Sequence, residues 1–242
     1  MNHLDEKFNQ VRKFCETRAN PAIVQKYSRY FTEGYDAYGL DQVIYEHQRD
    51  YWLKAWKNEM SLEDYLGLGD KLIATGKYEE ASFAIGFVAS RKEEYKTEHF
   101  ERIGQWLDNA IVNWAHTDNL CGRVLSVFFV KHLVELDIFR NWTKSDSKWK
   151  RRAVPVTMID ILNKECPLDQ MLSVIDPIME DDEKFVQKGL GWFLREAWKK
   201  YPEPVEAFML KWKDTCGRTI IQYATEKMGK EYRLKFRKSK IR

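Results

Sequence analysis

Apolar residues recur at intervals of three and four positions along most of the chain, which is the spacing of amphipathic helices. No segment combines strand-like alternation with a hairpin turn, and glycine and proline are sparse, at 12 and 6 residues. The pattern therefore predicts an all-α protein. Helix starts are expected at residues 20–21, 117–119 and 145–147, where capping side chains or a first-turn proline occur.

The segment 185–201 carries the helical pattern most clearly. At about 100° per residue, one stripe that should face the core contains Val186, Leu190, Phe193, Leu194 and Ala197. Trp192 lies about 120° or more from the centre of this stripe. The cations on its side of the helix are Lys188, Arg195 and Lys199. Two interpretations are open: Trp192 packs against a neighbouring repeat beside solvated cations, or this face stacks on a cation next to phosphate contacts.

The segment 145–162 has a similar organisation. Its apolar stripe contains Val154, Thr157, Met158 and Ile161. Arg152 projects about 150° from this stripe and is expected to face outward. It belongs to the run "KWKRR", which has four cations in five residues. Such a run suits a nucleic-acid backbone, although a solvated surface arginine is the more common case.

Trp114 and Asp118 stand four residues apart in the stretch "WAHTD". Trp114 continues a helical stripe that contains Phe100, Ile103, Leu107 and Ile111, and the pattern therefore favours a core position. Asp118 is expected to be the N-cap of a helix that begins near Asn119. An N-cap carboxylate is stabilised as the anion, which is the form that an electrostatic catalyst needs, so the capping and catalytic interpretations are compatible.

The segments around Trp114, Arg152 and Trp192 are separated by 38 and 40 residues. This spacing is close to the period of two-helix HEAT-type repeats. A HEAT-like helical repeat solenoid, an α-α superhelix with a long concave binding face, is therefore one prediction, and an irregular helical bundle is the alternative. The chain has 242 residues, of which 44% are hydrophobic and 14% aromatic. This is enough for a buried core, and we expect a single domain over residues 1–242.

Several functional classes lack their usual sequence signals. The longest apolar run, residues 124–130, is too short to span a bilayer, and the first ten residues do not resemble a signal peptide, so we expect a cytoplasmic protein without a membrane partner. The four cysteines have no C-x-x-C spacing and are expected to be reduced thiols. His116 and Cys121 would supply only two ligands, so no metal site is expected. Nucleotide-binding glycine motifs and the serine-hydrolase motif are absent.

The net charge of +3 is unevenly distributed. Residues 233–242, "RLKFRKSKIR", contain six basic side chains and no acidic one, which leaves a charge of −3 on the rest of the chain. This basic tail is expected either to be a frayed, solvated terminus or to contact phosphates.

Four stretches together resemble the AlkD-type DNA alkylation repair enzymes, which are HEAT-like, all-helical glycosylases. "WAHTD" is similar to the catalytic segment of this family and matches its tryptophan and aspartate with Trp114 and Asp118. "WKRRA" matches an arginine–alanine element at Arg152, and "FVQKGLGWFLREAWKKYP" closely resembles the helix that carries a second site tryptophan, here Trp192. "YSRYFTEGYDAYGL" resembles a weaker segment and places the site tyrosine at Tyr30.

The resemblance covers roughly residues 20–230. It departs from the family pattern at Pro155, at His116 and in the basic C-terminal extension, and none of these changes removes a site residue. It implies a monofunctional glycosylase that removes purines alkylated at N3 or N7 from duplex DNA without a cofactor, acting as a monomer.

In that resemblance, Asp118 would stabilise the oxocarbenium-like transition state. Trp114 and Trp192 would contact the lesion, Arg152 would hold a phosphate, and Tyr30 would contact neighbouring backbone. The alternative is a non-catalytic HEAT-like scaffold that binds DNA or a protein, in which Asp118 is only a cap and Trp114 only a core residue.

Overall fold

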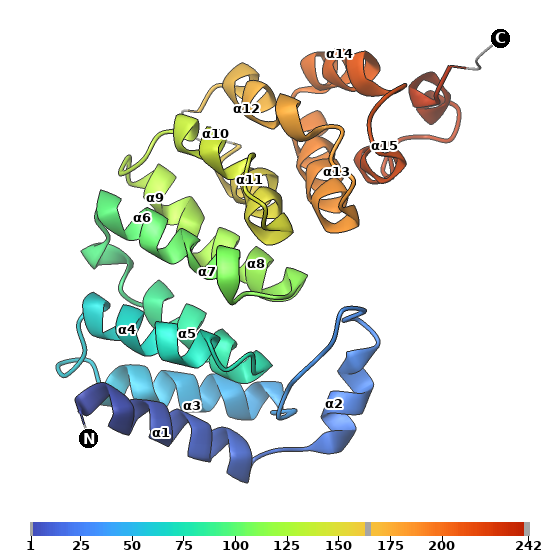
Figure 1. Cartoon of the computed structure of the whole chain (residues 1–242). Helices are drawn as coiled ribbons and strands as arrows, with labels where there is room; N and C mark the ends of the chain where they lie inside the picture. The colour runs from blue at the N-terminus through green and yellow to red at the C-terminus, as the bar shows by residue number, and fades with distance from the viewer. Residues whose placement is uncertain (1, 163–165, 240–242) are drawn as a thin grey trace. The chain divides into compact units, whose positions relative to one another are not determined.

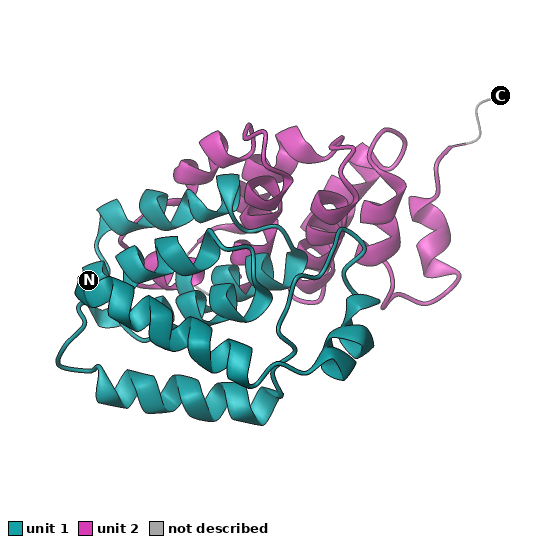
Figure 2. Cartoon of the chain, turned by 60° about the horizontal axis from the view of Figure 1, so that its bottom comes forward, with its two compact units in different colours: residues 1–124 teal, residues 125–242 magenta. Residues whose placement is uncertain are grey.

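The computed structural model describes residues 2–162 and 166–239, and every regular element in these ranges is a helix (Figure 1). The all-α prediction is therefore confirmed. The chain divides into two compact units, residues 1–124 and 125–242 (Figure 2). The expectation of a single repeat domain stays a prediction.

Several helices of the first unit start at a residue whose side chain caps the helix. As predicted, the side chain of Asn20 accepts a hydrogen bond from the backbone N–H of Ala22 at 3.0 Å, just before the first-turn Pro21. Ser61 and Asp64 form a reciprocal capping box. The elements are α1 (His3–Thr17), α2 (Pro21–Ser28), α3 (Gln42–Ala55), α4 (Leu62–Ile73), α5 (Tyr78–Ala89), η1 (Lys92–Glu94), α6 (Thr97–Gly104), α7 (Trp106–Asn109) and α8 (Trp114–Leu120).

Aromatic side chains fill the core of the first unit. Helix α5 packs against α1, α3, α4 and α8. Its Phe83 is fully buried, and the rings in contact with it belong to Phe14, Tyr45, Trp52 and Phe87. Because α5 is held on several sides, the side chains near its N-terminal end have a fixed support.

The second unit is also built of packed helices. Ser147 caps α11 by accepting a hydrogen bond from the backbone N–H of Lys150, as the sequence predicted. A π-helical segment, η2 (Cys121–Leu125), leads into this unit. Its elements are α9 (Ser126–Val130), η3 (Leu136–Ile138), α10 (Phe139–Trp142), α11 (Lys148–Ile161), α12 (Leu168–Ile175), η4 (Asp176–Ile178), α13 (Lys184–Trp198), α14 (Pro202–Trp212), α15 (Arg218–Ala224) and η5 (Tyr232–Phe236).

Helix α13 is the centre of the second unit and packs against α11, α14 and α15. The apolar stripe predicted for it, from Val186 to Ala197, is fully buried. Glycines let the neighbouring helices come close: a Cβ on Gly191 would lie 2.5 Å from Cβ of Tyr223 and 2.7 Å from the carbonyl oxygen of Ile220. A side chain at this position would therefore force α13 and α15 apart.

The described part of the basic tail, residues 233–239, is folded onto α14 and its C-terminal turn. Phe236 is 1% exposed. The Lys235 ammonium is paired with the Glu206 carboxylate, and the Ser239 hydroxyl contacts both Lys213 and Asp214. A buried aromatic ring and one ion pair hold these residues in place, which differs from the frayed-terminus interpretation. The remaining basic residues of the tail lie outside the described ranges.

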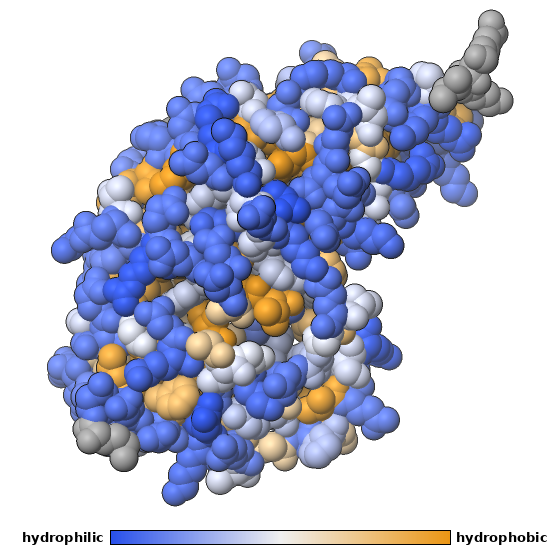
Figure 3. Space-filling model, in the orientation of Figure 1, coloured by the Kyte–Doolittle hydropathy of each residue, from blue (hydrophilic) through white to orange (hydrophobic). Residues whose placement is uncertain are grey.

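Polar and charged side chains cover most of the face seen in Figure 3, with smaller apolar patches between them. Across residues 2–162 and 166–239, no helix has the length and apolar character needed to cross a membrane.

Candidate functional site

Helix α8 begins at Trp114, five residues before the start near Asn119 that the sequence predicted. Asn113 is its N-cap, with extended backbone at φ −146° and ψ 158°, and its side chain accepts the backbone N–H of His116 at 2.9 Å. Asp118 therefore lies inside the helix, one turn after Trp114, and is partly exposed. The N-cap prediction for Asp118 and the helix start at 117–119 are wrong, because the buried Asn113 already supplies the cap.

Trp114 leaves the core, in contrast to the prediction from its helical spacing. Phe100 and Ile111 are buried as expected, but the helical repeat stops when α7 ends at Asn109, so the stripe does not continue into α8. The Trp114 ring is partly exposed and stacks on Phe31, with centroids 5.8 Å apart and an interplanar angle of 16°. Its Nε1–H donates to the backbone carbonyl of Tyr30 at 3.1 Å.

Tyr30 follows α2, a helix with no buried residue. Its side chain is 51% exposed, and its hydroxyl accepts a hydrogen bond from Nη2 of Arg29 at 2.8 Å. The guanidinium of Arg29 also lies over the Tyr30 ring, 4.8 Å from its centroid. Two residues selected from distant parts of the sequence, Tyr30 and Trp114, are thus in direct contact.

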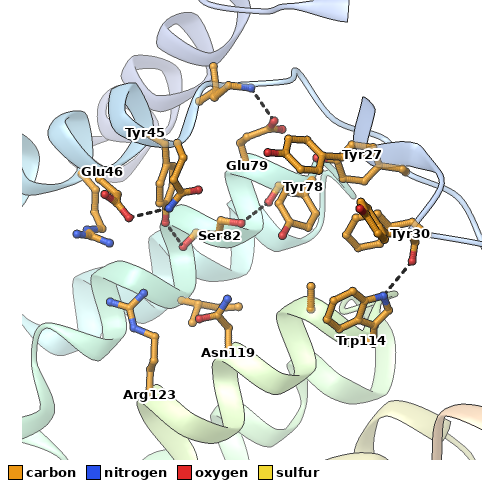
Figure 4. Close-up of a pocket in the computed structure, with 17 residues that line it drawn as sticks. Tyr27, Tyr30, Tyr45, Glu46, Tyr78, Glu79, Ser82, Trp114, Asn119 and Arg123 are labelled. Atoms are coloured by element: carbon orange, nitrogen blue, oxygen red, sulfur yellow. Dashed lines mark hydrogen bonds between the residues drawn. The ribbon is translucent and has the colours of Figure 1, made fainter. Parts of the chain in front are cut away.

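Tyr30 and Trp114 line a cavity of about 580 Å³ in the first unit (Figure 4). Seven of its lining residues are aromatic, namely Tyr27, Tyr30, Phe31, Tyr35, Tyr45, Tyr78 and Trp114. Polar and charged groups complete it, among them Gln42, Glu46, Arg49, Glu79, Ser82, Asn119 and Arg123. An aromatic wall with a few charged groups can take a planar, cationic or apolar group.

Asp118 lies beside this cavity rather than in its lining. Ala115 and Asn119, one helical turn apart, present α8 to the cavity. Asp118 precedes Asn119 by one residue, so its side chain leaves the helix about 100° away from that of Asn119.

Most of the cavity lining does not follow from the sequence pattern. Tyr35 belongs to the segment "YSRYFTEGYDAYGL", whose density of aromatic rings is a usable signal, although the family resemblance indicates only Tyr30 in it. Tyr45, Tyr78 and Arg123 carry no such signal. They reach the cavity from α3, α5 and η2, and only the tertiary packing brings these elements together.

His116 supports the cavity from behind. It is buried, and its ring stacks on Tyr78 with centroids 4.4 Å apart. Nε2 lies 3.0 Å from the Tyr78 carbonyl oxygen and therefore donates to it, and Nδ1 accepts from the Asn113 amide at 2.8 Å. Burial lowers the pKa of His116 to about 4, so the ring is neutral near pH 7. His116 joins α8 to α5 and has a structural role.

Glu79 fixes the loop that carries the aromatic residues. Its buried carboxylate accepts the backbone N–H groups of Tyr38, Gly39 and Leu40 at 2.8, 2.7 and 3.0 Å. Gly39 has φ +81°, and a Cβ there would lie 2.3 Å from the carbonyl oxygen of Asn20. The loop therefore crosses close to the start of α2 and is held to α5 by charge-assisted hydrogen bonds.

The second unit holds the other two predicted site residues, Arg152 on α11 and Trp192 on α13. Arg152 is 5% exposed, and its Nη1 donates to the backbone carbonyl of Phe185 at 2.5 Å. The prediction that it faces outward is wrong, because α11 packs against both α9 and α13 and is buried on most sides. Trp192 is partly exposed and lies outside the buried stripe, as predicted.

The run "KWKRR" is not an open cationic patch. Lys150 is 9% exposed and lies over the Trp142 ring, and Arg151 is paired with Asp181 at 2.6 Å. On α13, the predicted cationic face around Trp192 also contains a carboxylate, because Glu196 pairs with both Arg195 and Lys199. The charges near Arg152 and Trp192 are thus largely neutralised by local partners.

Metal ligands do not gather in the described parts of the chain. Within residues 2–162 and 166–239, no group of three or more histidine, cysteine, aspartate or glutamate side chains is arranged to hold a metal ion.

Solved structures with the same fold come from bacterial proteins. A predicted DNA alkylation repair enzyme from Enterococcus faecalis superposes with a TM-score of 0.69 at 18% identity, over 88% of this chain and 98% of that one. AlkD2 from Streptococcus mutans gives 0.56 at 18% identity, over 86% and 98%. The protein smu.31 from Streptococcus mutans UA159 gives 0.57 at 19% identity, over 86% and 100%. These likenesses support the predicted HEAT-like repeat fold.

The family itself is shown by sequence. No curated protein matches the chain significantly. A family model described as "DNA alkylation repair enzyme" matches residues 11–228, which is most of the chain and includes all five predicted site residues. The resemblance inferred from the four short stretches is therefore confirmed, and the chain belongs to the DNA alkylation repair enzyme family.

Proposed function

We propose that the chain is a monofunctional DNA glycosylase that hydrolyses the N-glycosidic bond of purines alkylated at N3 or N7 in duplex DNA. The observation that carries this proposal is the contact between Trp114 and Tyr30 at an aromatic cavity, with Asp118 one turn along the same helix. Membership of the DNA alkylation repair family supports the choice of substrate.

The reaction depends on charge. An alkyl group at N3 or N7 makes the purine cationic and therefore a good leaving group. As the base departs, positive charge develops on the deoxyribose, and the Asp118 carboxylate stabilises it and orients the attacking water. Two unit charges about 4 Å apart, at an effective dielectric near 20, attract by roughly 4 kcal/mol. If this attraction is realised only in the transition state, it supplies on the order of a thousandfold in rate.

The aromatic residues select the cationic base. A cation over a tryptophan face gains about 0.5–2 kcal/mol, and a neutral base gains less. The Trp114 ring is oriented in advance by Phe31 and the Tyr30 carbonyl, so little conformational entropy is lost when a base binds. Trp192 has the same role from the second unit, and the exposed Tyr30 contacts neighbouring nucleotides.

Arg152 is proposed to contact a phosphate, although its burial restricts the directions from which the phosphate can approach. Arg152 is 5% exposed at the junction of α11 and α13, so a phosphate must approach this junction closely to reach its guanidinium. The hydrogen bond from Nη1 of Arg152 to the Phe185 carbonyl fixes the position of the guanidinium before a phosphate binds. The proposed reaction uses water and needs no cofactor.

Base release tests the proposal directly. Wild-type protein, Asp118→Asn and Asp137→Asn are incubated with methylated duplex DNA, and free 7-methylguanine and 3-methyladenine are measured by chromatography. We expect release by the wild type, a loss of about a thousandfold in Asp118→Asn with unchanged DNA affinity, and normal release by Asp137→Asn. Asp137 is the matched control because its carboxylate is 80% exposed.

Two results would contradict the proposal. Equal release by Asp118→Asn and wild type would remove Asp118 from catalysis. Binding to DNA without release by any of the proteins would favour the non-catalytic DNA-binding scaffold, and an absence of salt-dependent DNA binding would favour a protein-binding scaffold.

A further inference from the structure

A second cavity, of about 600 Å³, lies in the second unit between α15 and the C-terminal segment. Its lining is strongly basic, with Arg218 from α15 and Lys230, Arg233 and Arg237 from the segment that follows. Glu231 is the one carboxylate among the described residues that line it. We call this feature the C-terminal basic cavity.

The walls of the C-terminal basic cavity are anchored. Phe236 lines the cavity and is 1% exposed, so the segment that carries the cations is held by a buried ring. The Tyr232 hydroxyl donates to Glu206 at 2.6 Å, and the backbone N–H of Ser239 donates to Asp214 at 2.5 Å. The cations of the tail are thus presented by a folded wall.

Among the residues that the structure describes, the four cations of the cavity are not paired with a carboxylate. Within residues 2–162 and 166–239, none of their side chains makes a hydrogen bond or an ion pair. Two other exposed cations of the second unit are paired, Arg140 with Asp137 at 2.7 Å and Lys211 with Asp176 at 2.6 Å. Like charges that share a concave surface repel one another, and a bound polyanion relieves this repulsion.

We propose that the C-terminal basic cavity binds backbone phosphates of nucleic acid, as a contact surface separate from the five predicted site residues. Four cations and one carboxylate leave a formal charge of +3. A single phosphate carries at most about two negative charges near pH 7, whereas a nucleic-acid strand presents a row of phosphates that can neutralise all of the excess. The inference rests on the DNA binding that the proposed function requires, but not on base excision.

The salt dependence of DNA affinity tests this inference. Affinity of the full chain for an unmodified labelled duplex is measured by fluorescence anisotropy between about 50 and 200 mM NaCl, because each phosphate contact adds about 0.9 to the slope of log K against log salt. We expect the slope of Arg218→Gln/Arg233→Gln to be shallower by about 2, with affinity reduced at least tenfold at the lowest salt concentration. The charge-conserving double variant with lysine at both positions should retain most of the slope, which controls for misfolding.

A matched control removes the same charge elsewhere. Arg140→Gln/Lys211→Gln neutralises two exposed, ion-paired cations of the second unit and should leave the slope almost unchanged. Equal slopes for the two glutamine variants would overturn the inference. It would also be overturned if only inorganic phosphate raised the melting temperature through Arg218 and Arg233, since the cavity would then hold a small anion.

Base release measured on the same proteins separates the two proposals. If the wild type releases alkylpurine while the slope of Arg218→Gln/Arg233→Gln is unchanged, only the phosphate-binding inference fails. If no protein releases base while the slope becomes shallower, only the glycosylase proposal fails.

Discussion

The two tryptophans of the candidate site are both partly exposed, but their surroundings hold them by different means. Trp114 lies beside a loop and a helix, α2, that bury almost nothing. Glu79 fixes the loop to α5, and His116 fixes α8, which carries Trp114, to α5. Trp192 lies on α13, whose apolar stripe is fully buried and whose Gly191 lets α15 approach closely. The first region therefore depends on hydrogen bonds and charge state, and the second depends on volume.

Loss of the Glu79 carboxylate should give the largest effect on stability. Glu79→Gln places an amide NH₂ opposite one of three backbone N–H donors in a buried position. We expect a decrease of about 3 kcal/mol in the free energy of unfolding, since hydrogen bonds to a charged group are worth about 1.5–3 kcal/mol each and repulsion replaces one of them. Urea denaturation measures the decrease, and hydrogen exchange should show faster opening of residues 31–41.

The control for this change is Glu46→Gln. Glu46 lines the same cavity but is exposed, and its partner in the first unit is the Gln42 side chain. Its substitution should leave the urea midpoint within the error of the wild type. Equal losses from both substitutions would mean that charge in the cavity, rather than the loop contacts, stabilises the first unit.

Titration of His116 should make the first region sensitive to acid. Its pKa in the folded chain, about 4, is below the ordinary value of 6.5, because burial disfavours the charged ring. The unfolded chain therefore binds more protons between these values. The stabilisation is complete above pH 6.5 and is lost as the pH falls toward 4, by on the order of 3 kcal/mol.

The dependence of the free energy of unfolding on pH is measured by urea denaturation across this pH range. His116→Gln keeps one donor and one acceptor without titrating, so its stability should vary less with pH than that of the wild type. His47→Gln, at an exposed histidine of α3, should keep the wild-type dependence. If His116→Gln and the wild type gave parallel curves, another group would cause the acid sensitivity.

A side chain added at Gly191 should destabilise the second region by more than the gain in helix propensity stabilises it. Alanine is favoured over glycine inside a helix by about 1 kcal/mol, but at Gly191 its Cβ would lie 2.5 Å from Tyr223 and 2.7 Å from a backbone oxygen. Overpacking of this kind costs about 1–3 kcal/mol. We expect Gly191→Ala to lose about 1–2 kcal/mol in thermal or urea unfolding. Gly229→Ala, where nothing lies within 4 Å of the added Cβ, should show no loss.

The same contrast explains what could be predicted from the sequence. The buried stripe of α13 follows from helical spacing alone, because one apolar face packs against neighbouring helices. The prediction that Arg152 faces outward failed because α11 packs against both α9 and α13, so the side opposite its apolar stripe is also buried at this position. The core position predicted for Trp114 was also wrong, because helical spacing alone does not show that α7 ends at Asn109 and that Asn113 caps a new helix. The cavity depends on contacts such as Glu79 with residues 38–40, which only the folded chain reveals.

The smallest predicted effect tests whether the two tryptophans act alike on the substrate. Trp114→Phe keeps an aromatic ring beside Phe31 but removes the Nε1–H bond to the Tyr30 carbonyl and part of the cation–π attraction. We expect the rate of 7-methylguanine release to fall by about fivefold, equivalent to about 1 kcal/mol. Trp192→Phe should give a fall of similar size if both rings face the cationic base.

Trp106→Phe is the control for loss of an indole hydrogen bond. Trp106 is buried, and its Nε1 donates to Asp70 at 2.7 Å, away from the aromatic cavity lining. Its substitution should lower stability without changing the single-turnover rate of the folded protein. A rate that fell for Trp106→Phe as much as for Trp114→Phe would assign the effect to the rigidity of the first unit. A rate that fell only for Trp114→Phe and Trp192→Phe would mean that two differently supported regions present rings to one substrate.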